Sequence, residues 1–134
     1  MTEAELFAKI RLWFIVHGHP TRIENVLSQG MPDVIYATEK GLMFIELKIE
    51  HARKIKLETF QIPFAMACLK WLPPGLYWFC VLRSWGAIHL LDANDILEGE
   101  MIPVKDGVTI SLDDMPISTT IDDANSVGKW LALI

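Results

Sequence analysis

The sequence has few of the features that mark secreted and membrane proteins. It contains two cysteines, at positions 68 and 80, which is too few for a disulfide-stapled scaffold, and both lie in apolar runs. We expect them to be buried thiols of a protein from a reducing compartment. No uncharged run reaches the ~18 apolar residues of a membrane-spanning helix. The first residues, MTEAEL, are acidic where a secretory signal is basic. These patterns predict a cytoplasmic protein.

An excess of basic residues is also missing. The chain carries 12 Lys and Arg against 17 Asp and Glu. Residues 1–70 hold nine basic and eight acidic side chains, whereas residues 71–134 hold three and nine, so the acidity lies in the second half. Nucleic-acid-binding proteins usually have a basic excess, and the charge balance argues mildly against this class. A site built from carboxylates weakens the argument, because a bound divalent cation offsets part of their charge.

What remains is the composition of a folded domain. The length of 134 residues predicts one domain, and the hydrophobic content of 51% excludes a disordered protein. It has no Gly-rich phosphate loop, no nucleophile elbow and no zinc-ligand spacing. Apolar periodicity predicts helices over 2–17, from near residue 60 to 72 and over 92–98, and strands over 21–27, 33–37, 42–49, 76–82 and 87–91.

The order of these elements predicts an α/β fold, a mixed β-sheet flanked by helices in a single domain. Residues 50–56 are expected to form a polar connection between the third strand and the second helix. Beyond residue 99 the apolar pattern breaks into short runs between aspartates, and we expect an acidic C-terminal tail.

The hairpin formed by the second and third expected strands brings two carboxylates together. A loop of two or of four residues places Asp33 opposite Glu46. Facing residues share a sheet face, with Cβ atoms ~5 Å apart. A three-residue loop would place Asp33 opposite Leu47 and separate the carboxylates.

The residue types at this position predict metal chemistry. Glu46 and Lys48 are two positions apart on a strand and project to one side, while Leu47 projects into the core. Two facing carboxylates repel each other unless a positive charge lies between them. Mg²⁺ takes hard oxygen ligands and keeps several waters, so Asp33 and Glu46 suit it. With Lys48 beside a metal-bound water, the set is fit for in-line attack on a phosphodiester.

The motif made by Pro32-Asp33 and Glu46-Leu47-Lys48 resembles that of the PD-(D/E)xK nuclease superfamily. The surrounding pattern is most similar to its VRR-type nuclease domains and Holliday-junction resolvases. The resemblance implies a restriction-endonuclease-like fold and a DNA endonuclease that uses Mg²⁺ or Mn²⁺. It also implies that Asp33 and Glu46 bind the metal with help from the Leu47 carbonyl, and that Lys48 assists the nucleophile.

The same family carries an acidic residue on its first helix and a glutamine on the helix after the motif. Glu3 lies on the apolar stripe of the first expected helix, with Glu5 as the alternative. Gln61 lies thirteen residues past Lys48, about where the family places its glutamine. The resemblance therefore adds Glu3 and Gln61 to the catalytic set.

Partners follow from the basic residues and from the resemblance. Arg53, Lys54 and Lys56 are predicted to contact DNA phosphates. The resemblance implies branched DNA, such as a Holliday junction, as substrate, and a homodimer as the active form. It divides the chain into a nuclease-like domain, 1–98, and a C-terminal extension, 99–134, which is a candidate interface. The alternative hypothesis is a non-catalytic binding or assembly module on a nuclease scaffold.

Overall fold

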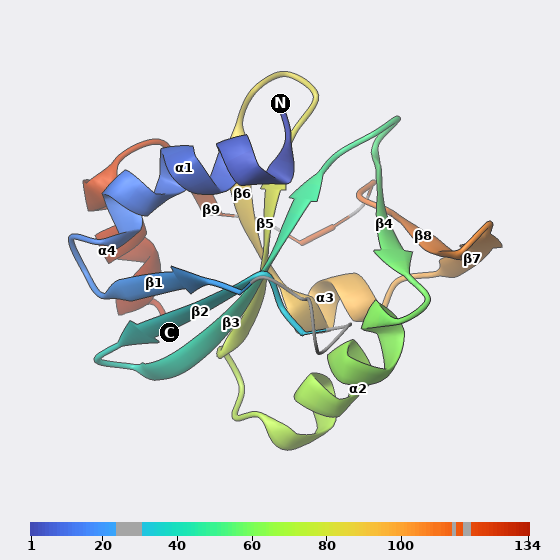
Figure 1. Cartoon of the computed structure of the whole chain (residues 1–134), viewed down its shortest axis with the longest axis horizontal. Helices are drawn as coiled ribbons and strands as arrows, with labels where there is room; N and C mark the ends of the chain where they lie inside the picture. The colour runs from blue at the N-terminus through green and yellow to red at the C-terminus, as the bar shows by residue number, and fades with distance from the viewer. Residues whose placement is uncertain (24–30, 114, 117–118) are drawn as a thin grey trace.

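The computed structural model describes residues 1–23, 31–113, 115–116 and 119–134. Strands β1, β2, β3, β5, β6 and β9 form a six-stranded sheet in that order, and β4, β8 and β7 form a three-stranded sheet (Figure 1). The helices and strands are α1 (Glu3–Phe14), β1 (His19–Arg22), β2 (Val34–Thr38), β3 (Gly41–Ile49), β4 (Lys54–Glu58), α2 (Gln61–Trp71), β5 (Tyr77–Leu82), β6 (Ile88–Asp92), α3 (Ala93–Leu97), β7 (Met101–Val104), β8 (Gly107–Ser111), β9 (Thr119–Ile121) and α4 (Ala124–Ala132). The predicted mixed α/β fold in a single domain is confirmed.

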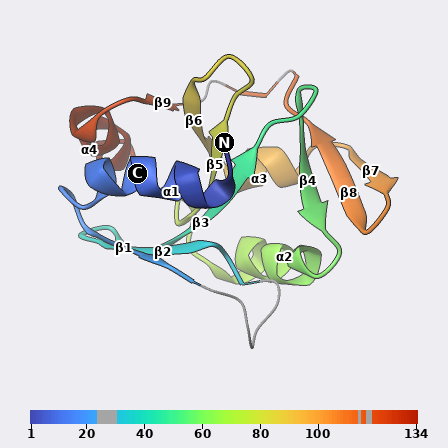
Figure 2. The same cartoon turned by 45° about the horizontal axis from the view of Figure 1, so that its top comes forward.

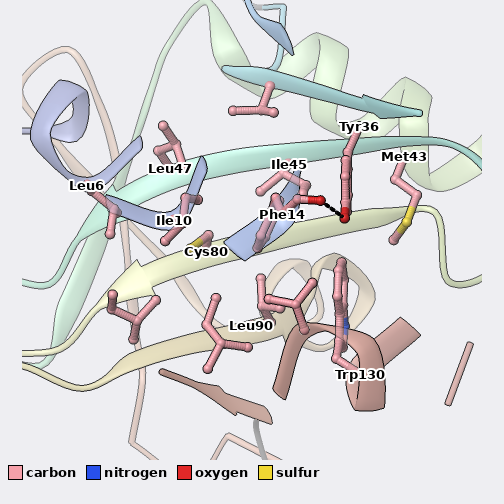
Figure 3. Close-up of a cluster of buried hydrophobic side chains, with 14 of the residues drawn as sticks. Leu6, Ile10, Phe14, Tyr36, Met43, Ile45, Leu47, Cys80, Leu90 and Trp130 are labelled. Atoms are coloured by element: carbon pink, nitrogen blue, oxygen red, sulfur yellow. Dashed lines mark hydrogen bonds between the residues drawn. The ribbon is translucent and has the colours of Figure 1, made fainter. Parts of the chain in front are cut away.

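Helices α1 and α4 cover one face of the six-stranded sheet. Helix α1 begins with a capping box, in which the Glu5 amide donates to Thr2 Oγ1 and the Thr2 amide donates to the Glu5 carboxylate. The core beneath it contains the apolar stripe Leu6, Ile10 and Phe14 together with Trp130 of α4. In the same core the Tyr36 hydroxyl donates to the Phe14 carbonyl at 2.6 Å (Figure 3). This core is formed by apolar and aromatic side chains.

A second core lies between the opposite face of the sheet, helices α2 and α3, and the three-stranded sheet. Strand β5 contributes to both cores, because Cys80 points to the first and Phe79 to the second. Helix α2 begins at Gln61, which confirms the predicted start near residue 60. Pro63 lies in its first turn, where backbone N–H groups have no partner within a helix.

The β2–β3 hairpin has the predicted register. Thr38 pairs with Gly41 and Val34 with Ile45, so the loop has two residues. On its other side β3 pairs in parallel with β5, and the chain between them passes through α2. Because β5 also pairs with β6, it is a central strand, which confirms the strand predicted over 76–82 with a start one residue later, at Tyr77.

Several element bounds differ from the prediction. The first helix ends at Phe14 instead of residue 17, and β1 begins before the expected strand 21–27, of which residues 24–27 lie outside the described part of the chain. The expected connection over 50–56 already contains the start of β4. Its sequence KIKLE alternates charged with apolar residues, and the charges hid a strand whose Ile55 and Leu57 are buried.

The sequence analysis assigned no elements to residues 99–134, but the described part of this segment contains three strands and a helix. Strands β7 and β8 extend β4 into a sheet, β9 pairs with the edge of β6, and α4 packs against α1. These strands have three to five residues each, which is too short for a clear apolar period. Within the described residues, no helix is long and apolar enough to span a membrane.

Candidate active site

Asp33 and Glu46 lie together at the start of β2. Asp33 immediately precedes β2, and the register that pairs Val34 with Ile45 places it opposite Glu46. The Asp33 carboxylate accepts a hydrogen bond from the Leu47 amide at 2.7 Å. This bond fixes Asp33 against the backbone of β3, with the Leu47 side chain fully buried in the core below.

Glu46 is a buried carboxylate with incomplete hydrogen bonding. It is 1% exposed, and its Oε1 accepts a hydrogen bond from the Tyr77 hydroxyl at 3.3 Å. Its Oε2 has no hydrogen-bond partner among the described residues. Burial raises the pKa of Glu46 well above its usual value, and so does the neighbouring charge of Asp33, whereas Lys48 lowers it. With both carboxylates ionised, the single positive charge of Lys48 would not balance the two negative charges of Asp33 and Glu46.

Lys48 is held by the helix that follows the motif. Its side chain is 6% exposed, and Nζ donates to Gln61 Oε1 at 2.9 Å. The same oxygen accepts the Glu58 amide at 2.9 Å. Gln61 is the first residue of α2, so its side chain joins the end of β4 to the ammonium group. The Lys48 ammonium keeps further N–H donors, since it carries three in total.

Glu3 and Glu5, the two candidates for the acidic residue on the first helix, have different surroundings in the structure. Glu5 is engaged in the capping box, and its hydrogen bonds with Thr2 lower its pKa. Glu3 is half-buried, and its pKa is raised, first by burial and then by the negative charge of Asp33. Lys48 acts in the opposite direction on the pKa of Glu3. Of the two glutamates, Glu3 is therefore the one whose pKa is shifted by the charged groups of the site.

The donor set suits a cation that has few protein ligands. No group of three or more His, Cys, Asp and Glu in the described ranges is arranged to hold a metal ion. Asp33 and Glu46 are two, and Mg²⁺ often binds through one or two carboxylates while keeping waters and substrate oxygens. The unpartnered Oε2 of Glu46 is the acceptor that such a cation would satisfy. The residues present therefore fit Mg²⁺ or Mn²⁺, with the Leu47 backbone alongside.

The three basic residues predicted to bind DNA lie on the β3–β4 turn and on β4. Arg53 is in the left-handed region with φ 60°, and its Nε is 3.8 Å from the exposed Asp113 carboxylate. Lys56 Nζ is 3.5 Å from Glu58. Lys54 is exposed. All three are on one short segment, and Arg53 and Lys56 each have an acidic neighbour.

Sequence analysis missed the contribution of Tyr77. Burial and the charge of Glu46 raise the pKa of its hydroxyl, which therefore stays protonated and donates to Glu46. The two residues are 31 positions apart, and only the parallel pairing of β3 with β5 brings them together. The available signal was a tyrosine in an otherwise apolar strand, since a buried tyrosine usually has a partner for its hydroxyl.

Comparisons with known proteins locate the fold. No protein-family model matches the sequence, and no curated protein matches it. Among solved structures, it is similar to Hjc of Archaeoglobus fulgidus, a Holliday junction resolvase from an archaeal hyperthermophile, with a TM-score of 0.59 and 13% identity. The match covers 96% of this chain and 97% of the other. This chain has the fold of an archaeal resolvase. The resolvase fold includes residues 99–134, because the match extends over nearly the whole of both chains.

Proposed function

We propose that this protein is a metal-dependent endonuclease that hydrolyses phosphodiester bonds of branched DNA, such as Holliday junctions. The observation that carries the proposal is the group of Asp33, Glu46 and Lys48 on one side of β3, with a buried carboxylate oxygen left unpartnered. The fold supports it, because the similar structure is that of a Holliday junction resolvase.

Asp33 and Glu46 would hold Mg²⁺ or Mn²⁺, with help from the Leu47 carbonyl. Such a cation lowers the pKa of a water that it binds and offsets charge on a phosphate. Tyr77 fixes one oxygen of Glu46, which leaves the other free for a ligand. The match between two carboxylate ligands and a hard cation is the basis for this assignment.

The remaining residues orient the reacting groups. Lys48 donates its free N–H groups to the attacking oxygen and to the phosphate, and so assists the nucleophile. Gln61 is a positioning residue, since it holds the Lys48 ammonium and does not itself reach the substrate in this proposal. Glu3, whose pKa is raised by burial and by the charge of Asp33, adds a third carboxylate to the proposed site.

DNA binding and assembly belong to the same proposal. Arg53, Lys54 and Lys56 contact the DNA backbone beside the site. Resolution of a four-way junction requires two symmetric cuts, so we propose a homodimer, and we place the protein in the cytoplasm. The extension 99–134 is the proposed interface.

The test is cleavage of three substrates by the purified protein with Mg²⁺: a labelled four-way junction, a linear duplex of the same sequence and a supercoiled plasmid. We expect junction cleavage that stops with EDTA and with Asp33→Asn. Glu39→Gln serves as the control, because Glu39 is an exposed carboxylate on the hairpin loop. A wild-type protein that binds these DNAs without cutting any of them would instead support the non-catalytic binding module.

A further inference from the structure

A second group of polar side chains lies next to the candidate site on the same face of the sheet. Lys48 and Glu50 are two positions apart on the path of β3, so they project to one side, about 7 Å from each other along the strand. Beyond the last pair of the parallel ladder, Ile49 with Leu82, the next residues are Glu50 and Arg83. These two side chains meet, and they continue the polar row of the site.

Glu50 and Arg83 form a buried ion pair. Arg83 Nε donates to Glu50 Oε2 at 3.1 Å, and Nη2 donates to Oε1 at 3.3 Å. The Ser84 amide donates to Oε2 at 2.6 Å. Arg83 Nη1 donates to His89 Nδ1 at 3.0 Å, which assigns the proton of that imidazole to Nε2. The guanidinium group is therefore fixed in position, and its charge is already neutralised.

Trp85 rests on this fixed guanidinium group. Arg83 Cζ is 4.5 Å from the centre of the Trp85 ring, and the His89 ring packs against it at 5.9 Å. The turn that carries Trp85 is closed by hydrogen bonds between Arg83 and Ala87 and between Gly86 and Arg83. Trp85 is 63% exposed, even though the Arg83 guanidinium group lies against its ring. A rigid indole with open surface is the arrangement on which nucleic-acid bases stack.

The location of this turn connects Trp85 with the site. Figures 1 and 2 both show the β5–β6 turn beside the start of α1, the helix that carries Glu3. The charges of Asp33 and Lys48 both act on the pKa of Glu3. The contacts from Glu50 through Arg83 to Trp85 continue the polar row that begins at Lys48, so they lead from the candidate site to this turn.

We propose that Trp85 stacks on an unpaired base of the DNA substrate, next to the phosphodiester that is cleaved. The proposal rests on the proposed nuclease function and names its substrate class: DNA with interrupted base stacking. Bases inside a continuous duplex are covered by their neighbours, so the indole reaches a base only at a branch point, a gap or a single-stranded flank. Because Glu50 neutralises Arg83, the contribution is stacking and not phosphate attraction.

The test is DNA binding in EDTA, where no cleavage occurs, measured by fluorescence anisotropy with a labelled four-way junction and with a continuous duplex. We expect Trp85→Ala to weaken junction binding at least about fivefold, with duplex binding unchanged. Trp85→Phe keeps an aromatic face and retains most of the affinity. Trp71→Ala is the matched control, since Trp71 is 75% exposed and lies beside the Lys70 ammonium at the end of α2.

Unchanged junction binding by Trp85→Ala would overturn the proposal, and so would an equal loss on both DNAs. A shift of Trp85→Ala to a smaller oligomer in size-exclusion chromatography, with junction affinity unchanged, would assign Trp85 to a protein interface and also overturn it. The nuclease proposal is tested by a different measurement: it fails if the wild type cleaves none of the DNAs with Mg²⁺.

Discussion

Gln61 Oε1 accepts a hydrogen bond from Lys48 Nζ at 2.9 Å. The first residue of α2 therefore holds the ammonium group that is proposed to assist the nucleophile. The same oxygen also accepts the Glu58 amide. One side chain therefore joins a strand end, a helix start and the candidate site, and its replacement has two separable effects.

Replacing Gln61 with Ala is expected to lower kcat for junction cleavage ~10- to 100-fold, since a misplaced group costs about this much, while KM changes little. Gln61→Glu retains an oxygen at this position and is expected to recover part of kcat. Loss of the bond to Glu58 costs about 1 kcal/mol of unfolding free energy, measured by urea denaturation. Met66→Ala, at an exposed position of the same helix, is the control. Equal kcat in Gln61→Ala and wild type would remove Gln61 from the mechanism.

Glu46 makes stability depend on pH. Its raised pKa means that the folded state holds a proton which the unfolded state has lost, so without metal the free energy of unfolding falls as pH rises from the usual glutamate pKa through the raised one. Glu46→Gln is expected to remove this decline and to be more stable than wild type at neutral pH by about 1–3 kcal/mol. Urea unfolding in EDTA from pH 4 to 8 measures both. A decline of the same size in Glu46→Gln would assign it to another group.

Magnesium is expected to stabilise the folded protein through the same carboxylate. A ligand that binds only the folded state at ten times its Kd adds about 1.4 kcal/mol, which raises the Tm of the wild type by several degrees. Glu46→Gln should show little of this rise, while Glu39→Gln should show all of it. The readout is differential scanning fluorimetry with and without Mg²⁺, and an equal rise in all three proteins would place the metal elsewhere.

Two substitutions in the turn between β3 and β4 distinguish the effect of backbone strain from the effect of DNA binding. Ala52 and Arg53 have φ of 51° and 60°, which non-glycine residues rarely adopt, and both are central residues of a two-residue turn closed by His51 and Lys54. Ala52→Gly and Arg53→Gly are each expected to stabilise the protein by about 0.5–1 kcal/mol. Only Arg53→Gly removes a charge, so only this variant should weaken DNA binding and lower the salt-dependence slope by about one. Equal DNA affinity in both variants would exclude Arg53 as a phosphate contact.

The hairpin at the site could be predicted from the sequence because its register depends on the length of one short loop. Placing Asp33 across from Glu46 needed only the alternation of side chains on a strand and a loop with an even number of residues. Glu3 was likewise placed by helical spacing from Leu6 and Ile10, which are buried.

The remaining features depend on pairing between distant segments. Tyr77 reaches Glu46 through a parallel strand pair, and Arg83 reaches Glu50 in the same way, so neither contact has a local signal. The alternating sequence of β4 can be recognised as a half-buried strand only when its pairing with β8 is known. In this chain, the register of the β2–β3 hairpin therefore follows from local sequence, whereas the candidate site also needs contacts between distant segments.

The most direct test of the central claim is single-turnover cleavage of a labelled four-way junction with Mg²⁺ by wild type and by Glu46→Gln. The variant is well suited because it is expected to be at least as stable as the wild type, so a loss of activity cannot be ascribed to unfolding. We expect the wild type to cut the junction and Glu46→Gln to be slower by at least about 1,000-fold, equivalent to ~4 kcal/mol of barrier. Cleavage at the wild-type rate by the variant would contradict the account.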